Sequence, residues 1–377
     1  MNTRENILAI LNYQPYERLP LVCFGYWNET VDKWAQEGRF SQALADEYKT
    51  KGGNSDAGRE INRLLGFDYN WGDTCFGVNS FMAPPFTTET LETKSDGSTV
   101  IRDHMGLICL VKPDVVSIPA EIGTTLTDRA AWEEHYKHRF QFCPDRVNAA
   151  AVRALPDPVV CEEPQGLFLG SLAGNMRNML GVQEMSYLYA DDEELYAEIV
   201  DTLCGLIYKC TEAILQAGGR FDYAHFWEDI CFKNGPLISP EVFREYFAPW
   251  YRKLTGLLNS YGVKIVSLDC DGLIDALLPI WLENGVNTMF PIEVGTWKAS
   301  IEPWRAAYGR DLRGVGGMNK NTFSQDRAAI DQEIKRLERL IRLGGYIPCP
   351  DHRIAPDAEF ELVRYYCERM RQAGAGL

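Results

Sequence analysis

From about residue 128 onward the sequence repeats one pattern, in which a short apolar segment of strand length precedes a longer segment of helix length. The short segments lie near 158–161, 167–172, 221–226, 263–268, 288–292, 312–317 and 345–348. Repeated units of this kind predict parallel strands joined by helices. Such units form a (β/α)8 barrel, or TIM barrel, of roughly 250 residues, which is the predicted fold. A doubly wound sheet is the alternative, but no GxGxxG follows an N-terminal strand.

The first third of the chain departs from this pattern. A helix is predicted to begin at Thr3, and further helices at 30–37 and 40–48 follow a buried strand at 21–27, which gives the barrel an N-terminal helical extension. Between about 73 and 113, strand-length segments surround a turn at Asp96-Gly97 and predict an antiparallel β-meander. We therefore expect residues 1–377 to form a single barrel domain with a β insertion at 73–113.

Composition excludes several classes of function. The net charge of −15 argues against nucleic acid and anionic membranes as partners, because both require a basic surface. No run of about 18 apolar residues and no signal-peptide core occurs, which predicts a cytoplasmic protein. The 11 cysteines are scattered without a CxxC pair, so we expect buried thiols and no disulfide framework.

The segment Val263–Gly272 carries the first candidate for chemistry, and an amphipathic helix is predicted to follow it at 273–284. An apolar strand ends there in Asp269, Cys270 and Asp271, at the end of a parallel strand where barrel enzymes place their active sites. In an extended chain Asp269 and Asp271 point the same way and Cys270 points the other way. With His352, which follows a later strand, they form a set that suits zinc or a harder divalent metal. The spacing alone favours the alternative that Asp271-Gly272 is only a turn and helix cap.

Other strand ends supply further candidates. Glu228 follows Phe226-Trp227, an aromatic setting that raises the pKa of a carboxyl group and suits a general acid, although a salt bridge with Lys233 is an equal alternative. His225, inside its strand, is expected to be a core histidine. The side chains predicted to wall a substrate pocket are Tyr26, Trp27, Asn28, Trp227 and Cys270.

Nearly the whole chain resembles the uroporphyrinogen decarboxylase superfamily, which contains that decarboxylase and cobalamin-dependent methyltransferases of the methanol:coenzyme M type. The matching segments are Arg4-Glu5, Glu17-Arg18-Leu19-Pro20, Gly235 to Phe243 with Pro249, Val263 to Gly272, and Gly345 to Pro356. The resemblance implies a (β/α)8 barrel, in agreement with the strand–helix pattern, and permits a homodimer.

The resemblance is closer to the methyltransferase branch. The decarboxylase holds its substrate carboxylates with an arginine-rich segment, whereas no arginine occurs here between Arg18 and Arg39. The methyltransferases bind zinc through a His-x-Cys-Gly strand end and a later cysteine. The matching positions here are Asp269, Asp271 with Gly272, and His352, so hard ligands replace soft ones.

The resemblance therefore implies a divalent metal, with zinc as one candidate, held by Asp269, Asp271 and His352. It implies transfer of a methyl group from a small, methoxylated substrate to or from a corrinoid protein. The candidate catalytic groups are Glu228, because of its aromatic setting, and His352. The chain has no Asp-x-His-x-x-Gly cobalamin motif, so the corrinoid belongs to a partner. The alternatives are a tetrapyrrole or other carboxylic-acid decarboxylase and a non-catalytic binding barrel.

Overall fold

A six-stranded parallel sheet forms the centre of the molecule. The computed structural model describes residues 1–72, 74–113 and 119–374. Strand order in this sheet is β14-β13-β12-β11-β8-β7. The strands are β7 (Gly166–Gly170), β8 (Tyr223–Trp227), β11 (Ile265–Asp269), β12 (Thr288–Phe290), β13 (Arg313–Met318) and β14 (Tyr346–Pro350). All five residues of β11 are buried, as expected for a parallel strand that is covered on both faces.

A second parallel pair, β1 (Val22–Cys23) with β2 (Tyr69–Asn70), connects to both edges of this sheet. Next to β14, the Trp27 amide donates to the Ile354 carbonyl at 3.1 Å. Next to β7, the Phe76 amide donates to the Gly166 carbonyl at 2.7 Å. Isolated parallel bridges mark the same two places. The chain segments around β1 and β2 therefore lie between the two edge strands of the six-stranded sheet.

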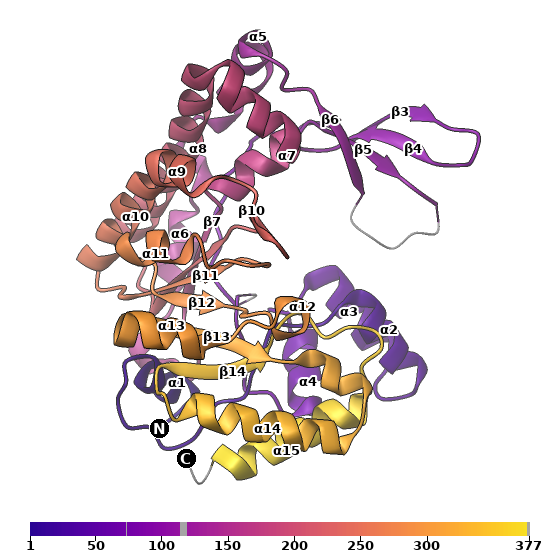
Figure 1. The fold of residues 1–377 in the computed structure, drawn as a ribbon, viewed down its shortest axis with the longest axis vertical. Coiled ribbons are helices and arrows are strands. Elements are labelled where there is room, and N and C mark those ends of the chain that lie inside the picture. Colours follow the sequence, from indigo (N-terminus) through magenta and orange to yellow (C-terminus); the bar gives the residue numbers. More distant parts are fainter. Residues whose placement is uncertain (73, 114–118, 375–377) are drawn as a thin grey trace.

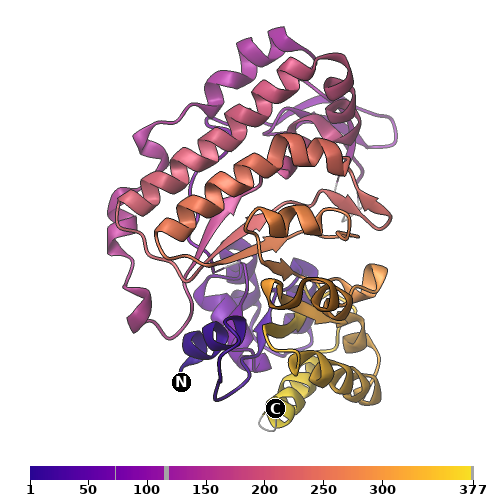
Figure 2. The same cartoon turned by 60° about the vertical axis from the view of Figure 1, so that its left-hand side comes forward.

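Helices follow most of the strands and cover the outside of the sheet (Figures 1 and 2). Helix α14 is typical, because Asp326 caps its first turn and its buried residues Ile330, Ile334, Leu337 and Ile341 recur at helical spacing. The longer helices are α1 (Thr3–Leu11), α2 (Asn28–Gln36), α3 (Gln42–Lys51), α4 (Asp56–Leu65), α7 (Ala173–Asp191), α8 (Glu193–Gln216), α10 (Ala248–Ser260), α13 (Ile301–Tyr308), α14 (Arg327–Ile341) and α15 (Phe360–Gly374). The shorter ones are α5 (Arg129–Ala131), α6 (Ala149–Ala154), α9 (Pro240–Val242), α11 (Leu278–Glu283) and α12 (Val294–Trp297). No helix in the described part of the chain is both long and apolar enough to cross a membrane.

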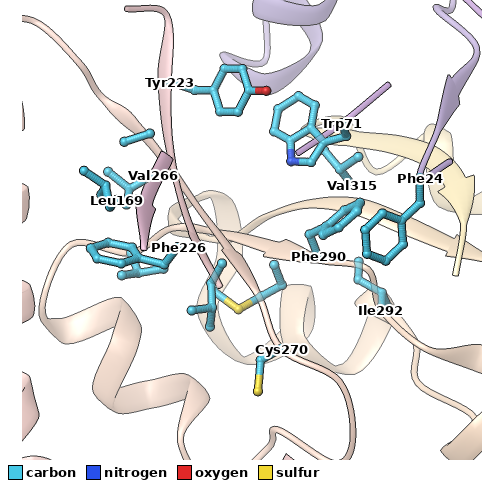
Figure 3. Packing of buried hydrophobic residues seen from close by; sticks show 14 of the residues in the cluster. Phe24, Trp71, Leu169, Tyr223, Phe226, Val266, Cys270, Phe290, Ile292 and Val315 are labelled. Atoms are coloured by element: carbon cyan, nitrogen blue, oxygen red, sulfur yellow. The ribbon is translucent and has the colours of Figure 1, made fainter. Parts of the chain in front are cut away.

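Aromatic side chains fill the space enclosed by the strands. Figure 3 shows Trp71 beside Tyr223 and Phe24 beside Phe290. The first pair is stacked with ring centroids 4.4 Å apart, and the second meets edge to face at 4.4 Å. These contacts join the β1–β2 segment to β8 and β12, so the core fixes the position of the strand ends that carry the polar candidates.

The antiparallel insertion is present with shifted bounds. Strands β3 (Glu89–Thr93), β4 (Thr99–Arg102), β5 (Leu107–Val111) and β6 (Ala120–Thr124) form a four-stranded antiparallel sheet. It projects from the molecule on the same side as α2 and α3 (Figure 1). The prediction of 73–113 omitted β6, because β6 has little apolar character and is defined by its pairing with β5.

Two other predicted elements differ. The predicted strand at 158–161 is a 3₁₀ turn, Pro158–Val160, capped by Asp157. Its valines Val159 and Val160 are exposed, so the apolar run does not mark a buried strand. The helix predicted at 273–284 forms only from Leu278 to Glu283.

Candidate functional site

Three aspartates meet where β8 and β11 end. The parallel register pairs Asp269 with Trp227, which brings the following residues Asp271 and Asp229 to the same level. The Asp271 amide donates to Asp229 Oδ1 at 3.2 Å. Each of the three carboxylates places an oxygen within 4.8 Å of the other two. This convergence is a candidate metal site of hard ligands.

His352 adds an imidazole to the cluster from the chain that follows β14. Its Nε2 lies 3.3 Å from Asp271 Oδ2. The indole of Trp27 stacks on the imidazole with centroids 5.6 Å apart and planes 19° apart. Asp271 Oδ1 and His352 Nδ1 are both buried and have no hydrogen-bond partner among the described residues. Since unpaired buried polar atoms are costly, these two atoms fit a site that binds a metal or a polar substrate.

The aspartates and His352 line a cavity of about 380 Å³. Aromatic side chains from several strands form much of its wall. The lining residues are Phe24, Trp27, Gly72, Phe168, His225, Trp227, Asp229, Asp269, Asp271, His352 and Arg353. This combination of a flat aromatic wall with a few convergent polar groups is typical of small-molecule sites.

The imidazole of His225 forms part of the wall of this cavity. It is buried, and burial lowers its pKa to about 3. The buried Ser267 hydroxyl accepts from Trp71 Nε1 at 3.1 Å and lies 2.9 Å from His225 Nδ1. If the Ser267 hydroxyl donates its proton to Nδ1, the imidazole proton lies on Nε2 and both groups are satisfied.

The glycine opposite this imidazole keeps its Nε2 accessible. Gly72 has a φ of 90°, and a Cβ added there would lie 3.3 Å from His225 Nε2. The prediction of a core histidine was therefore incomplete, because the His225 ring is buried but also forms part of the cavity wall.

Glu228 lies outside the cavity and binds the start of helix α7. It accepts the amides of Leu172, Ala173 and Gly174 at 2.8, 3.0 and 2.9 Å, and also the hydroxyls of Ser171 and Tyr251. It is fully buried, and burial raises its pKa. The Glu228 carboxylate therefore faces the start of α7 and Tyr251 rather than Lys233, which gives it a positioning role in the fold.

We expect Glu228→Gln to destabilise the protein by about 3 kcal/mol, because one acceptor oxygen becomes an amide that faces N–H and O–H donors. The control is Glu245→Gln, which changes an exposed carboxylate in the helical segment before α10. Urea unfolding of both variants measures the difference in the free energy of unfolding. Equal midpoints for the two variants would contradict the positioning role.

The predicted pocket residues divide into two groups. Trp27 and Trp227 line the cavity, as predicted. Tyr26, Asn28 and Cys270 do not. Tyr26 is buried on the opposite side of its extended segment, where its hydroxyl donates to Asn62 Oδ1 at 2.6 Å. Asn28 is exposed at the first residue of α2.

Cys270 points away from Asp269 and Asp271, as the strand alternation predicted. Its thiol is buried and interacts with Cys231. The side chains of Asp229 and His225 were not among the predicted site residues. Both lie two residues from Trp227 along β8 and its extension, and therefore on the same face of the strand as Trp227.

The carboxylate cluster makes the stability of the metal-free protein depend on pH. Burial, and then the charge of Asp271, raise the pKa of Asp229 from 3.8 to about 6. A carboxyl group with a raised pKa in the folded state stabilises the fold most below pH 4, and this contribution is lost as the pH rises through 6. The whole effect is at most about 3 kcal/mol.

We therefore expect the melting temperature of the metal-free protein to fall between pH 4.5 and pH 7. The variant Asp229→Asn should flatten this dependence, because it has no carboxyl group to titrate. Thermal unfolding in the presence of a chelator checks both. An equally steep fall in Asp229→Asn would contradict the assignment.

No protein-family model matches the chain, and no curated protein matches its sequence. Among solved structures, the chain is similar to a methyltransferase from Methanosarcina mazei. The two share 15% identity over 99% of this chain and 98% of that one, with a TM-score of 0.58. A B12-independent methionine synthase from a Shewanella species, in complex with selenomethionine, shares 11% identity over 95% of this chain and 97% of that one, with a TM-score of 0.46. At these identities the likeness to the Methanosarcina protein shows a shared fold.

Proposed function

We propose that this protein is a metal-dependent methyltransferase with a (β/α)8 barrel fold, of the uroporphyrinogen decarboxylase superfamily. Its donor is a small methoxylated compound, and its methyl acceptor is a corrinoid carried by a separate protein. The observation that carries the proposal is the convergence of Asp229, Asp269 and Asp271 within 4.8 Å beside His352. The fold shared with a methyltransferase over nearly the full length of both chains supports it.

The residues fit a divalent cation. Three carboxylates and one imidazole form an oxygen-rich ligand set, and the unpartnered Asp271 Oδ1 and His352 Nδ1 belong to it. A cation bound there supplies Lewis-acid polarisation of a leaving oxygen. Replacement of the soft ligands of the thiol-dependent branch by carboxylates favours an oxygen-linked methyl donor over a thiol partner.

The other cavity residues bind and orient the donor. Trp27, Trp227 and Phe168 offer flat apolar surfaces to one aromatic ring, and a cavity of about 380 Å³ accommodates a ring of that size. The Nε2–H of His225 donates to an oxygen of the substrate. Because the imidazole stays neutral at physiological pH, it supplies a hydrogen bond without a competing positive charge.

A methyl-transfer assay tests the proposal. Metal-loaded protein is mixed with a panel of methoxylated benzenes and free cob(I)alamin, and formation of methylcobalamin is followed by its absorbance. We expect transfer with at least one donor and its loss after chelation. Transfer that is unchanged by complete metal removal would contradict the metal role. Metal-independent release of CO2 from a carboxylated substrate would favour the decarboxylase instead.

A further inference from the structure

A second cavity, of about 290 Å³, lies at the other end of the strands. It is bounded by the segment after α1 and by the turn between α14 and β14, with Tyr13, Tyr16, Arg310 and Arg342 in its wall. Because β13 begins at Arg313 and β14 at Tyr346, this cavity lies at the amino ends of the strands. Figure 1 shows α1 and α13 there, across the molecule from α2 and α3.

Arg310 and Arg342 line this cavity, and Arg305 and Arg313 lie beside it over the Tyr13 ring. These four arginines are called the basic cluster. The guanidinium carbons of Arg305, Arg310 and Arg313 lie 4.9, 5.2 and 5.6 Å from the centre of the Tyr13 ring. Tyr13 adopts a φ of 57°, which is uncommon for a bulky residue, and its hydroxyl donates to the Leu312 carbonyl at 2.6 Å. The ring is thus fixed as a platform beneath the cations.

Two members of the basic cluster have hydrogen-bond partners and two do not. Arg305 donates to the Leu343 carbonyl at 2.7 Å, and Arg313 Nε donates to the Leu11 carbonyl at 2.6 Å. Arg310 and Arg342 are exposed and line the cavity, with no hydrogen bond or ion pair recorded to any described residue. Structural roles therefore account for Arg305 and Arg313 and leave Arg310 and Arg342 to be explained.

The basic cluster has no salt bridge among the described residues, and Asp311 is the one acid whose charge acts on Arg313. Among the described residues, no carboxylate lies within salt-bridge distance of any of its four guanidinium groups, although the chain has 53 acidic and 38 basic residues. Burial lowers the pKa of Arg313, Tyr13 and Asp311 partly offset this effect, and the like charge of Arg305 adds to it. Collecting like charges in a chain with abundant acids is unfavourable unless an anion joins them.

We propose that this cavity binds a small phosphorylated molecule, whose phosphate groups are held by Arg310 and Arg342. The planar, forked guanidinium groups match the oxygens of a phosphate. Ile10, Pro15 and Tyr16 provide an apolar wall for the rest of the ligand, and the cavity of about 290 Å³ holds a group of small-molecule size. The site stands apart from the aspartate cluster and does not depend on the proposed methyl transfer.

Calorimetric titration with inorganic pyrophosphate at constant ionic strength tests the proposal. We expect one binding site per chain, and an increase in Kd of at least about tenfold in Arg310→Ala and in Arg342→Ala. The matched control is Arg153→Ala, which removes an exposed arginine of α6 that has no recorded partner among the described residues. Its Kd should equal that of the wild type.

Two further titrations distinguish phosphate binding at the basic cluster from binding at the aspartates and from general attraction of anions. Pyrophosphate also chelates metals and would therefore bind to a metal held by the aspartates. If it binds at the basic cluster instead, Asp269→Ala should bind it as well as the wild type does. Loss of binding in that variant would assign the ligand to the carboxylate cavity and overturn the proposal. Malonate should bind much more weakly than pyrophosphate, and equal binding would overturn the assignment to phosphate. No saturable binding, or binding unaffected by either arginine substitution, would also overturn it.

Discussion

Purified protein that is reconstituted with zinc, manganese or magnesium is expected to retain about one equivalent of a divalent metal per chain. Asp229→Ala, Asp269→Ala and His352→Ala should each weaken metal binding by more than about 100-fold, because outer-shell partners alone contribute 10- to 100-fold. Elemental analysis after gel filtration, followed by competition with a chromogenic chelator, measures stoichiometry and affinity.

The matched control for this experiment is Asp275→Asn. Asp275 lies four residues beyond Asp271, is exposed, and accepts a hydrogen bond from Trp304 Nε1 at 2.6 Å. It lies outside the cavity, so its variant should keep the metal. Failure of the wild type to take up any metal, or retention of metal by the three alanine variants, would sink the assignment.

Asp229→Ala and Asp269→Ala carry a second signature, which carboxylates with a purely structural role would not show. In the metal-free protein, Asp229, Asp269 and Asp271 repel one another, and Asp229 is in addition largely buried. Removing one charge should therefore raise the melting temperature of the metal-free protein near pH 7 while it abolishes metal binding. Carboxylates that served only to stabilise the fold would give the opposite shift.

The aspartates of the site were predictable from the alternation of side chains along a strand, and the same alternation accounts for the cavity residues that were not selected. Asp269 and Asp271 were expected to face the same way, and both line the cavity. Along β8 and just beyond it, His225, Trp227 and Asp229 share one parity and also line the cavity, whereas Phe226 and Glu228 face outward. Glu228 was selected because it follows two aromatic residues. Parity counted from Trp227 would have selected Asp229 and His225 instead.

Other features depend on contacts between segments far apart in the sequence. The role of Glu228 requires the amino end of α7, some 55 residues earlier, and no local pattern announces that contact. The tautomer of His225 depends on Ser267 and Trp71, which belong to two other parts of the chain. The alternation of strands and helices is a local property, and for this reason the parallel sheet was predictable while these polar networks were not.

The largest effect on turnover outside the metal ligands is expected at His225. If the proposed methyl transfer is correct, His225→Phe should lower kcat/KM by about 100- to 1,000-fold, because it removes a preorganised hydrogen-bond donor from a buried site and keeps a ring of similar size. His225→Gln, which retains an N–H donor, should recover part of the activity. Metal content should be unchanged in both variants, which separates this effect from loss of a ligand.

Ser267→Ala tests whether His225 acts as a hydrogen-bond donor with a fixed tautomer or only as part of the cavity wall. Without the hydroxyl, His225 Nδ1 loses its recorded partner, and the proton is free to occupy either nitrogen of the ring. We expect a loss of about tenfold in kcat/KM, which is smaller than the loss in His225→Phe. In the double variant Ser267→Ala/His225→Phe the two losses should not add, because both changes act on the same hydrogen bond. His104→Gln, at an exposed histidine of the β insertion, is the control.

The pH dependence of kcat/KM gives a separate test of the His225 role. Since burial holds the pKa of His225 at about 3, its protonation contributes no limb to the profile of kcat/KM between pH 5 and 9. A wild-type limb in that range that disappears in His225→Gln would show that the imidazole titrates during turnover, and the neutral-donor role would then be wrong.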